Sequence, residues 1–281
     1  MNKLTKTIRI IMLAGLLSGF FFSFTAFAQE NLQSTLKEVS EKSDKIETIK
    51  ENHELSNEER ALLDIQVRKD VVLKTLELTV LEDTDLQNKL NAITNLSESE
   101  LAVRNYLLKL LEENKKVYEM IRERLDGADT VKEIKSLAND FKNWRSLSYN
   151  QKVENMVSFI SVFQQKKILK TAESRLQIIE EGINKLKELG ILENKVGNLF
   201  QKSSEAINDA KIANNKALET VLQIINNEIS PKDGGFIKNI VSFGKKMVTQ
   251  ITVKKLVNDS MQQVREAYKL FSQISDLVSE K

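Results

Sequence analysis

The residue types that metal sites use are present in this chain, but they are not spaced as a metal site requires. His53 is the only histidine, in the run Glu51-Asn52-His53-Glu54. Zinc sites built on histidine combine several ligands, and no second histidine is available to join the neighbouring carboxylates. We therefore expect His53 to be a solvated side chain near a helix end, and we expect no metal site.

Paired carboxylates are the next candidates, because two acidic groups can share acid–base work. Such pairs occur at Glu58–Glu59, Glu112–Glu113 and Glu180–Glu181. General acid–base catalysis requires burial and a perturbed pKa. These pairs fall opposite the apolar stripes of their segments, so we expect solvated helix faces. Di-iron bundles use Glu-x-x-His, and no histidine here lies three residues after a glutamate.

Nucleophilic and phosphate-binding motifs are also missing. The chain has no cysteine and no Gly-x-Ser-x-Gly, and Gly234-Gly235 is an isolated pair rather than a phosphate-binding loop. Ser-x-x-Lys occurs only as often as a chain rich in both residues would produce it. The sequence therefore predicts a non-enzymatic protein with no catalytic residue, no cofactor and no evident small-molecule substrate.

One aromatic cluster, residues 141–149, contains the only tryptophan. Trp, Tyr and Arg dominate the energetics of protein interfaces, so Trp144, Arg145 and Tyr149 are the candidate partner-binding residues. The alternative, which we favour, is that Phe141 and Trp144 belong to a helical core. In that case Arg145 and Tyr149 are expected to be the more exposed members.

Residues 235–248 form a second unusual stretch, apolar on one face, basic on the other and without an acidic residue. This composition suits a helix lying in a membrane interface, with Phe236, Ile240 and Phe243 as the candidate membrane-contacting residues. A helix that closes a bundle would look similar, and we favour that interpretation. The stretch is too short and too charged to span a bilayer.

The N-terminus has the pattern of a secretory signal peptide. Lys3, Lys6 and Arg9 precede an apolar run, and Ala26-Phe27-Ala28 predicts cleavage after Ala28. The apolar run, residues 10–24, is shorter than the roughly 20 residues of a membrane-spanning helix. No cysteine follows, which excludes a lipoprotein anchor and a disulfide framework. We expect an extracytoplasmic protein, either periplasmic or secreted.

Charge argues against nucleic acid as a partner. Three of the 42 basic residues lie in the first 28, so residues 29–281 contain 39 basic and 40 acidic residues, a net charge of −1. Nucleic-acid binding needs concentrated positive charge, whereas balanced charge is typical of solvated helix faces. The expected partner is a protein, or a second copy of the chain, bound through helical surfaces, with peripheral membrane contact as a further option.

Composition and periodicity predict an all-α fold. Pro231 is the only proline, glycine is sparse, and no alternating β-branched stretch is present. Capping boxes at Ser56/Glu59, Ser97/Glu100 and Thr130/Glu133 predict three helix starts. Gly127 is expected to end the second of these helices, and Asp83-Thr84-Asp85 is expected to break the first. The apolar pattern is interrupted at residues 145–148 and resumes after them.

Apolar residues recur at three and four along the predicted helices, the spacing of helices that pair with a left-handed crossing. Each such line of apolar residues forms a seam. One seam contains Asn114 among leucines, and another shifts its phase across residues 164–167. A third is unusually rich in serine and alanine between Ser203 and Ala217. Caps and slips interrupt the repeats, so we favour an elongated antiparallel bundle of coiled-coil-like helices over one long parallel coiled coil.

The pattern Phe141…Trp144-Arg145…Tyr149, followed by Phe159-Ile160, Val162-Phe163-Gln164 and Arg175-Leu176, resembles uncharacterised exported helical proteins of bacteria. This resemblance covers about the middle third and implies extracytoplasmic location and a helical fold. The signal peptide and heptads are also similar to those of periplasmic coiled-coil chaperones of the Skp type, which are shorter and strongly basic.

The predicted organisation is a signal peptide at 1–28, a polar helical segment at 29–54, a main helical bundle at 55–230 and an amphipathic helical segment at 231–281. The function that fits is a structural or protein-interaction module of the bacterial envelope. The alternatives are a membrane-active protein similar to helical pore-forming toxins, using residues 236–248, and a periplasmic coiled-coil chaperone.

Overall fold

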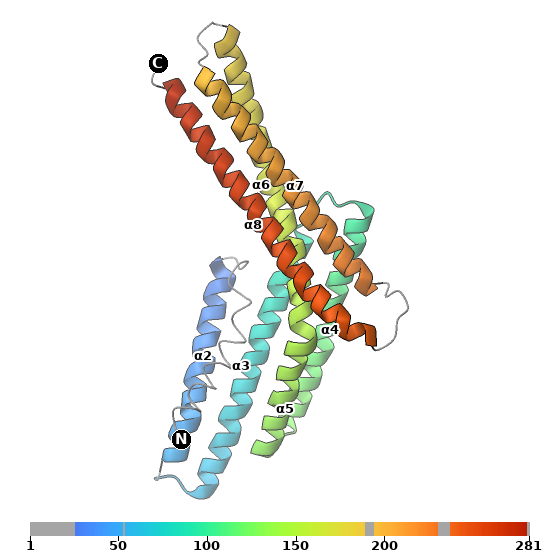
Figure 1. The fold of residues 1–281 in the computed structure, drawn as a ribbon. Coiled ribbons are helices and arrows are strands. Elements are labelled where there is room, and N and C mark those ends of the chain that lie inside the picture. The colour runs from blue at the N-terminus through green and yellow to red at the C-terminus, as the bar shows by residue number, and fades with distance from the viewer. Residues whose placement is uncertain (1–25, 53, 189–193, 230–236, 280–281) are drawn as a thin grey trace. The chain divides into compact units, whose positions relative to one another are not determined.

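In the computed structural model, the described residues (26–52, 54–188, 194–229 and 237–279) are helical apart from short connections, and they include no strand. Figure 1 shows the helices in chain order. They are α2 (Ala26–Glu51), α3 (Asn57–Asn91), α4 (Glu98–Asp126), α5 (Val131–Trp144), the π-helical turn η1 (Arg145–Tyr149), α6 (Asn150–Glu188), α7 (Asn194–Ile229) and α8 (Ile237–Ser279). The predicted all-α class is therefore confirmed for this part of the chain.

The chain divides into two compact units. Unit one ends at Met156 and contains α2 to η1 with the first residues of α6, and unit two, from Val157, contains the rest of α6 with α7 and α8. This boundary lies inside the range 55–230 in which the sequence analysis expected one bundle. Helix α8 lies in the same unit as α7.

All three predicted capping boxes are present. Ser56, Ser97 and Thr130 each accept a hydrogen bond from the backbone N–H of a glutamate three residues later, and that glutamate accepts one from the backbone N–H of the capping residue. These reciprocal bonds satisfy two donors that a helix start otherwise leaves free. As expected, α4 ends against Gly127, whose N–H bonds the Glu123 carbonyl.

The expected break at residues 83–85 is wrong, because α3 runs unbroken from Asn57 to Asn91. Aspartate favours turns because its side chain competes for backbone hydrogen bonds. Asp83 instead points into the core, where side chains of α4 and η1 occupy its oxygens. A tertiary environment has overridden a local preference.

The lapse expected at residues 145–148 does not separate two helices either. The turn η1 joins α5 to α6, and the Asn150 N–H donates to the Arg145 carbonyl five residues earlier. An i→i+5 bond defines a π turn, which is wider than an α turn and occurs most often as a single insertion at functional segments.

The core of unit one comes from α3, α4 and α5. Its buried members are Val72, Leu76, Tyr118, Ile121, Leu125, Ala128, Ile134, Leu137 and Phe141. Leu62, expected in the buried stripe of α3, is 68% exposed, so the stripe starts later than predicted. Helix α2 packs on α3, buries Val39, Ile46 and Ile49, and forms the Lys42–Asp70 ion pair at 2.6 Å.

Unit two is built from α6, α7 and α8, and α7 and α8 form the most extensive helix pair in the described residues. Four of the five small seam residues expected in α7, namely Ser203, Ala206, Ala210 and Ala217, are buried, as a close helix approach requires. Val278, expected in the seam of α8, is 39% exposed.

The phase slip in α6 places one polar side chain in the core of unit two. Gln165 is 1% exposed, and its amide donates to the Ser260 hydroxyl at 3.0 Å. Ser260 in turn donates to the Ala210 carbonyl at 2.8 Å. One polar chain thus links all three helices of the unit.

The capping box at Ser97 allows a direct test of helix-start energetics. Ser97→Ala should lower the free energy of unfolding of unit one by about 1 kcal/mol, because it leaves one donor of α4 unsatisfied. The measurement is urea unfolding followed by the fluorescence of Trp144, the only tryptophan, which lies in unit one. Thr94→Ala, at an exposed position of the preceding loop, is the control and should change stability far less; equal losses would contradict the cap.

Candidate functional site

The carboxylate pairs singled out in the sequence lie on the surface. Glu58–Glu59, Glu112–Glu113 and Glu180–Glu181 are all exposed, as expected of solvated helix faces. Glu59 serves as the capping residue described above, and its bond to the Ser56 backbone N–H lowers the pKa of its carboxyl. None of these pairs is brought together with the aromatic cluster.

Two further candidates lie outside what the structure describes. His53 and Phe236 are not among the described residues, and the side chains of Ile240 and Phe243 are not described although their backbone lies in α8. The interpretations of His53 as a surface residue and of residues 236–248 as a membrane-contacting segment therefore stay predictions.

The aromatic cluster lies largely in the core of unit one. Phe141 is 4% exposed and stacks on Trp144 with ring centroids 5.8 Å apart. Trp144, half-buried, also meets the edge of Tyr118 at 5.8 Å and packs on Tyr149 at 5.1 Å. The expectation that Arg145 and Tyr149 are the more exposed members is wrong, since they are 5% and 0% exposed.

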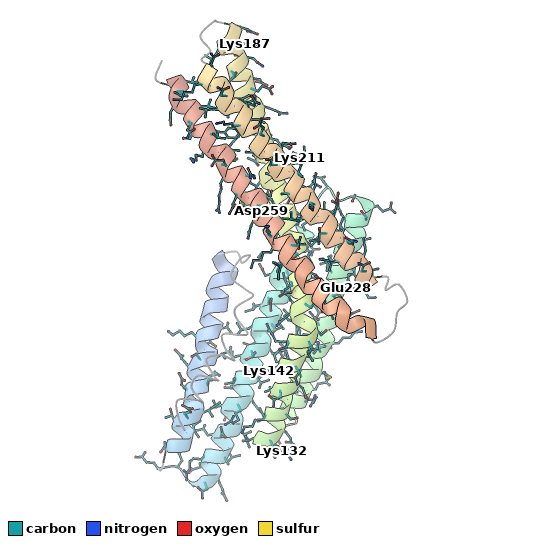
Figure 2. All side chains as sticks on the ribbon, viewed as in Figure 1. Lys132, Lys142, Lys187, Lys211, Glu228 and Asp259 are labelled. Carbon is teal, nitrogen blue, oxygen red and sulfur yellow. The ribbon has the colours of Figure 1, made fainter. Side chains whose placement is uncertain are left out.

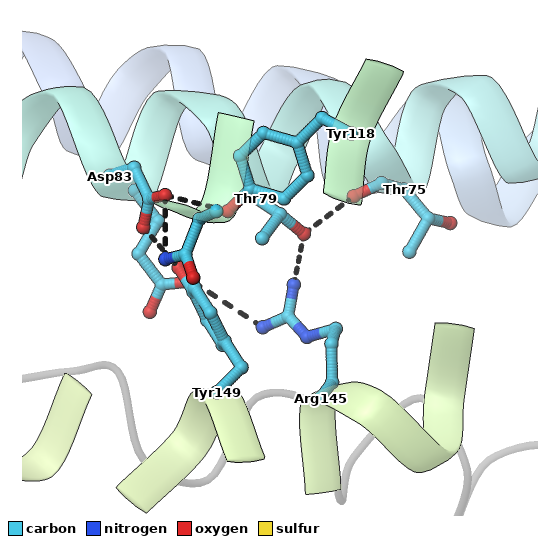
Figure 3. A network of polar contacts seen from close by, with 8 residues as sticks. Thr75, Thr79, Asp83, Tyr118, Arg145 and Tyr149 are labelled. Carbon is cyan, nitrogen blue, oxygen red and sulfur yellow. Dashed lines mark hydrogen bonds and ion pairs between the residues drawn. The ribbon is translucent and has the colours of Figure 1, made fainter. Parts of the chain in front are cut away.

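Arg145 and Tyr149 are held in the core by a set of polar side chains that we call the buried polar cluster (Figure 3). Each member is at most 7% exposed. The members come from three elements: Thr79, Glu82 and Asp83 on α3, Asn114 and Tyr118 on α4, and Arg145 and Tyr149 on η1. The cluster therefore links α3 and α4, two of the three helices that build the core of unit one, to the π turn η1.

Asp83 is the acceptor at the centre of the cluster. Its Oδ2 accepts from the Tyr118 hydroxyl at 2.6 Å and from the Asn114 amide at 3.0 Å. Its Oδ1 lies 2.9 Å from the Tyr149 hydroxyl. Donors from two helices thus surround one carboxyl group, as a buried acidic side chain requires.

Arg145 and Glu82 form the second half of the cluster. The Arg145 guanidinium donates to the Thr79 hydroxyl and approaches Glu82 Oε2 at 3.4 Å. Thr79 in turn donates to the Thr75 carbonyl at 3.0 Å, and the Tyr149 hydroxyl lies 2.7 Å from Glu82 Oε2. Arg145 also lies over the Tyr149 ring, 4.9 Å from its centroid, so the two side chains support one another.

Sequence reasoning missed Glu82, Asp83, Thr79 and Tyr118 as site residues, although a signal was available. Asp83 lies seven residues from both Leu76 and Leu90, two fully buried seam positions of α3. A charged residue in a heptad seam must find a partner in the core or remain unpaired at high cost. The same argument applies to Asn114, which the sequence did show within the seam of α4.

The π turn explains how Arg145 and Tyr149 can share a face. An α-helical turn holds 3.6 residues, so positions four apart drift around the axis. Phe141, Arg145 and Tyr149 follow one another at four-residue spacing, and all three are buried. The wider π turn compensates for the drift and directs both polar side chains at α3.

Burial sets the protonation behaviour of the cluster. Desolvation raises the pKa of Glu82 to about 8, against the opposing charge of Arg145 and the bond to Tyr149. It also raises the pKa of Asp83, although hydrogen bonds from Tyr118, Asn114 and Tyr149 partly offset the effect. The pKa values of Tyr118 and Tyr149 are raised as well, first by burial and then by the neighbouring carboxyl groups.

Carboxyl groups with raised pKa values beside tyrosines and an arginine are typical of active sites, but buried ion-pair networks shift pKa values in the same way. All seven side chains are closed off from solvent and bonded to one another. The arrangement can hold and exchange protons and can fix helix positions. It offers no reacting atom to a molecule in solution.

Comparison of the chain with protein-family models, with curated proteins and with solved structures found no match. No helix among the described residues combines the length and the apolarity that crossing a bilayer requires. Within the same residues, no group of three or more His, Asp or Glu side chains is placed to hold a metal ion.

Replacing Arg145 should test the energetics of the cluster. Arg145→Met removes the only cation among the seven residues and should lower the free energy of unfolding of unit one by about 3–5 kcal/mol, because a buried carboxylate is left without its counter-charge. Pairing it with Glu82→Leu should recover part of the loss. The measurement is urea unfolding followed by Trp144 fluorescence.

Arg124→Met is the matched control for this experiment. Arg124 pairs with Asp140 at 3.0 Å, but both side chains are about half exposed, and exposed pairs contribute 1 kcal/mol or less, roughly. A cost for Arg145→Met no larger than that for Arg124→Met would show that the buried cluster does not stabilise unit one.

Proposed function

We propose that this chain is an exported, non-enzymatic helical protein of the bacterial envelope, acting as a structural or protein-interaction module. One observation carries the proposal: the densest set of chemically capable side chains is sealed inside unit one and serves as a cross-link between helices. What the helices present outward is charge and scattered apolar residues, which suits the binding of a protein or of a second copy.

The finer architecture belongs to the same proposal. We infer an antiparallel, coiled-coil-like pairing of successive helices, supported by short connections such as that between Asn91 and Glu98 and by buried seams at three- and four-residue spacing. The pattern of a secretory signal peptide in residues 1–28 supports extracytoplasmic location.

The outward surface offers a starting point for partner binding. Charged side chains such as Lys132, Lys142 and Lys211 line the helices (Figure 2). Leu147, in the π turn beside half-buried Trp144, is 80% exposed. Tryptophan is enriched among the residues that dominate interface energetics, and Arg145 and Tyr149 are buried, so half-buried Trp144 and exposed Leu147 replace Arg145 and Tyr149 as the residues to test.

Export is tested first. Full-length protein produced in a bacterial host should appear in the extracytoplasmic fraction with Gln29 as its N-terminal residue, because Ala26-Phe27-Ala28 presents small residues at the cleavage site. The measurements are fractionation and mass spectrometry of the intact chain. Ala28→Tyr is the control that should block processing. Protein that stays in the cytoplasm with its first 28 residues intact would contradict the proposal.

Co-sedimentation of the purified protein with anionic phospholipid vesicles, at low and high salt, distinguishes the membrane-active alternative from the interaction module. The interaction-module proposal predicts no binding at high salt and no dye release. Salt-resistant binding with leakage would overturn it in favour of a membrane-active protein, and would make Phe236 and Phe243 the residues to replace.

A further inference from the structure

The Tyr149 hydroxyl lies between two carboxyl groups. Its oxygen is 2.7 Å from Glu82 Oε2 and 2.9 Å from Asp83 Oδ1. A phenol carries one proton and can donate to only one of them. Two oxygen atoms at hydrogen-bond distance repel each other unless a proton lies between them, so the second contact needs a proton from the other partner.

Two observations place that second proton on Glu82 rather than on Asp83. Asp83 accepts from two further donors, Tyr118 and Asn114, and donors to a carboxylate favour its ionised form. Apart from the Tyr149 contact, the only donor near Glu82 Oε2 in the described part of the chain is the Arg145 guanidinium, at the longer distance of 3.4 Å. Glu82 Oε1 has no hydrogen-bond partner among the described residues. A neutral acid tolerates a buried, unbonded oxygen far better than a carboxylate does.

The charge of the cluster leads to the same assignment. Arg145 of η1 is its only cation, whereas α3 contributes two acidic groups, and α4 contributes neutral Asn114 and the phenol of Tyr118. From α5, the residues that face this core are apolar. The charged groups of α2 that contact α3 pair elsewhere, Lys42 with Asp70 and Glu38 with Lys74. One ionised carboxylate balances Arg145, and a second would leave excess negative charge in the core.

We propose that Glu82, Tyr149 and Asp83 share a chain of protons in folded unit one, and that loss of the Glu82 proton at rising pH releases the π turn from α3. In the closed state the Glu82 O–H donates to the Tyr149 oxygen, and the Tyr149 O–H donates to Asp83 Oδ1. On ionisation the Glu82 O–H bond breaks and the proton leaves to water. Tyr149 then faces two anions with one proton.

The π turn is where such a release would act. Arg145 and Tyr149 are its first and last residues, and their side chains bind it to α3 through Thr79, Glu82 and Asp83. A π turn is rare, and α-helix is the usual state of a continuous helical segment. Weakening these bonds should therefore open the junction of α5 and α6 locally before unit one unfolds.

The direction of the pH dependence follows from burial. The pKa of Glu82 is raised from 4.5 to about 8 in the folded protein, so folded unit one keeps a proton that the unfolded chain releases. The stabilisation is complete below about pH 4.5 and is lost as the pH rises to about 8. Across this window the unfolding equilibrium constant should rise by up to about tenfold per pH unit.

The test follows Trp144 fluorescence and urea unfolding of the purified protein from pH 5 to pH 9. The wild type should lose stability as the pH rises and level off above about pH 8. The stability of the Glu82→Gln variant should change little with pH, because the neutral amide of Gln does not titrate and can also donate to the Tyr149 oxygen. Two variants should keep the wild-type slope: Glu113→Gln, at an exposed position on α4, and His53→Gln, which removes the only histidine of the sequence.

Local release has its own readout. Hydrogen exchange of the backbone of residues 145–150 should be faster at pH 8.5 in the wild type than in Glu82→Gln at the same pH, whereas peptides from α4 should differ little. Three results would each overturn the proposal. The wild-type stability could be independent of pH, the Glu82→Gln variant could keep the wild-type dependence of stability on pH, or residues 145–150 could exchange hydrogen equally fast in the two proteins.

A second measurement covers the case in which Glu82→Gln does not fold. Infrared difference spectra of the wild type between pH 6 and pH 9 should show a protonated buried carboxylic acid that disappears as the pH rises. Tyr149→Phe should shift this signal, because it removes the bonded phenol. The absence of any protonated carboxylic acid at pH 6 would overturn the proposal without reference to the variant.

Discussion

Unit one depends on how charge is accommodated inside a helical core. Glu82 and Asp83 lie side by side on the buried face of α3, and a carboxyl group in the core is stable only with donors or a counter-charge beside it. Those donors come from α4 and from η1, so α3 reaches its observed position only when both neighbours are in register. The apolar seams supply the burial, while the cluster determines which residues face one another.

The features that sequence predicted well are local ones. A capping box needs only a serine or threonine and a glutamate three residues later, and the three predicted boxes are all present. The seams were largely correct for the same reason, because three- and four-residue spacing on one helix defines a buried face without knowledge of the partner. The exceptions, Leu62 and Val278, are exposed residues that lie near helix ends.

The cluster could not be assembled by local reasoning because its bonds between elements join residues that lie 31 to 67 positions apart. Asp83 was interpreted as part of a helix break, which is what an aspartate between Glu82 and Thr84 indicates when its partners are unknown. Arg145 and Tyr149 were expected at the surface because arginine is rarely buried. The π turn brings both Arg145 and Tyr149 into the core, and no residue pattern in the sequence predicted that turn.

A charged residue in a seam also restricts the alternatives that a repetitive helical sequence can adopt. Leucine seams of similar spacing can slide by one heptad with little loss of burial, but a slide of α4 along α3 would carry Asn114 and Tyr118 away from Asp83 and leave a buried carboxyl without donors. The Gln165–Ser260–Ala210 chain plays the equivalent part in unit two. The chain has no cysteine and hence no disulfide, and hydrogen-bonded polar groups of this kind help to fix helix register. Under the proposal made above, the attachment of η1 to α3 through Glu82 and Tyr149 is in addition sensitive to the protonation of Glu82, a property that a purely apolar seam would lack.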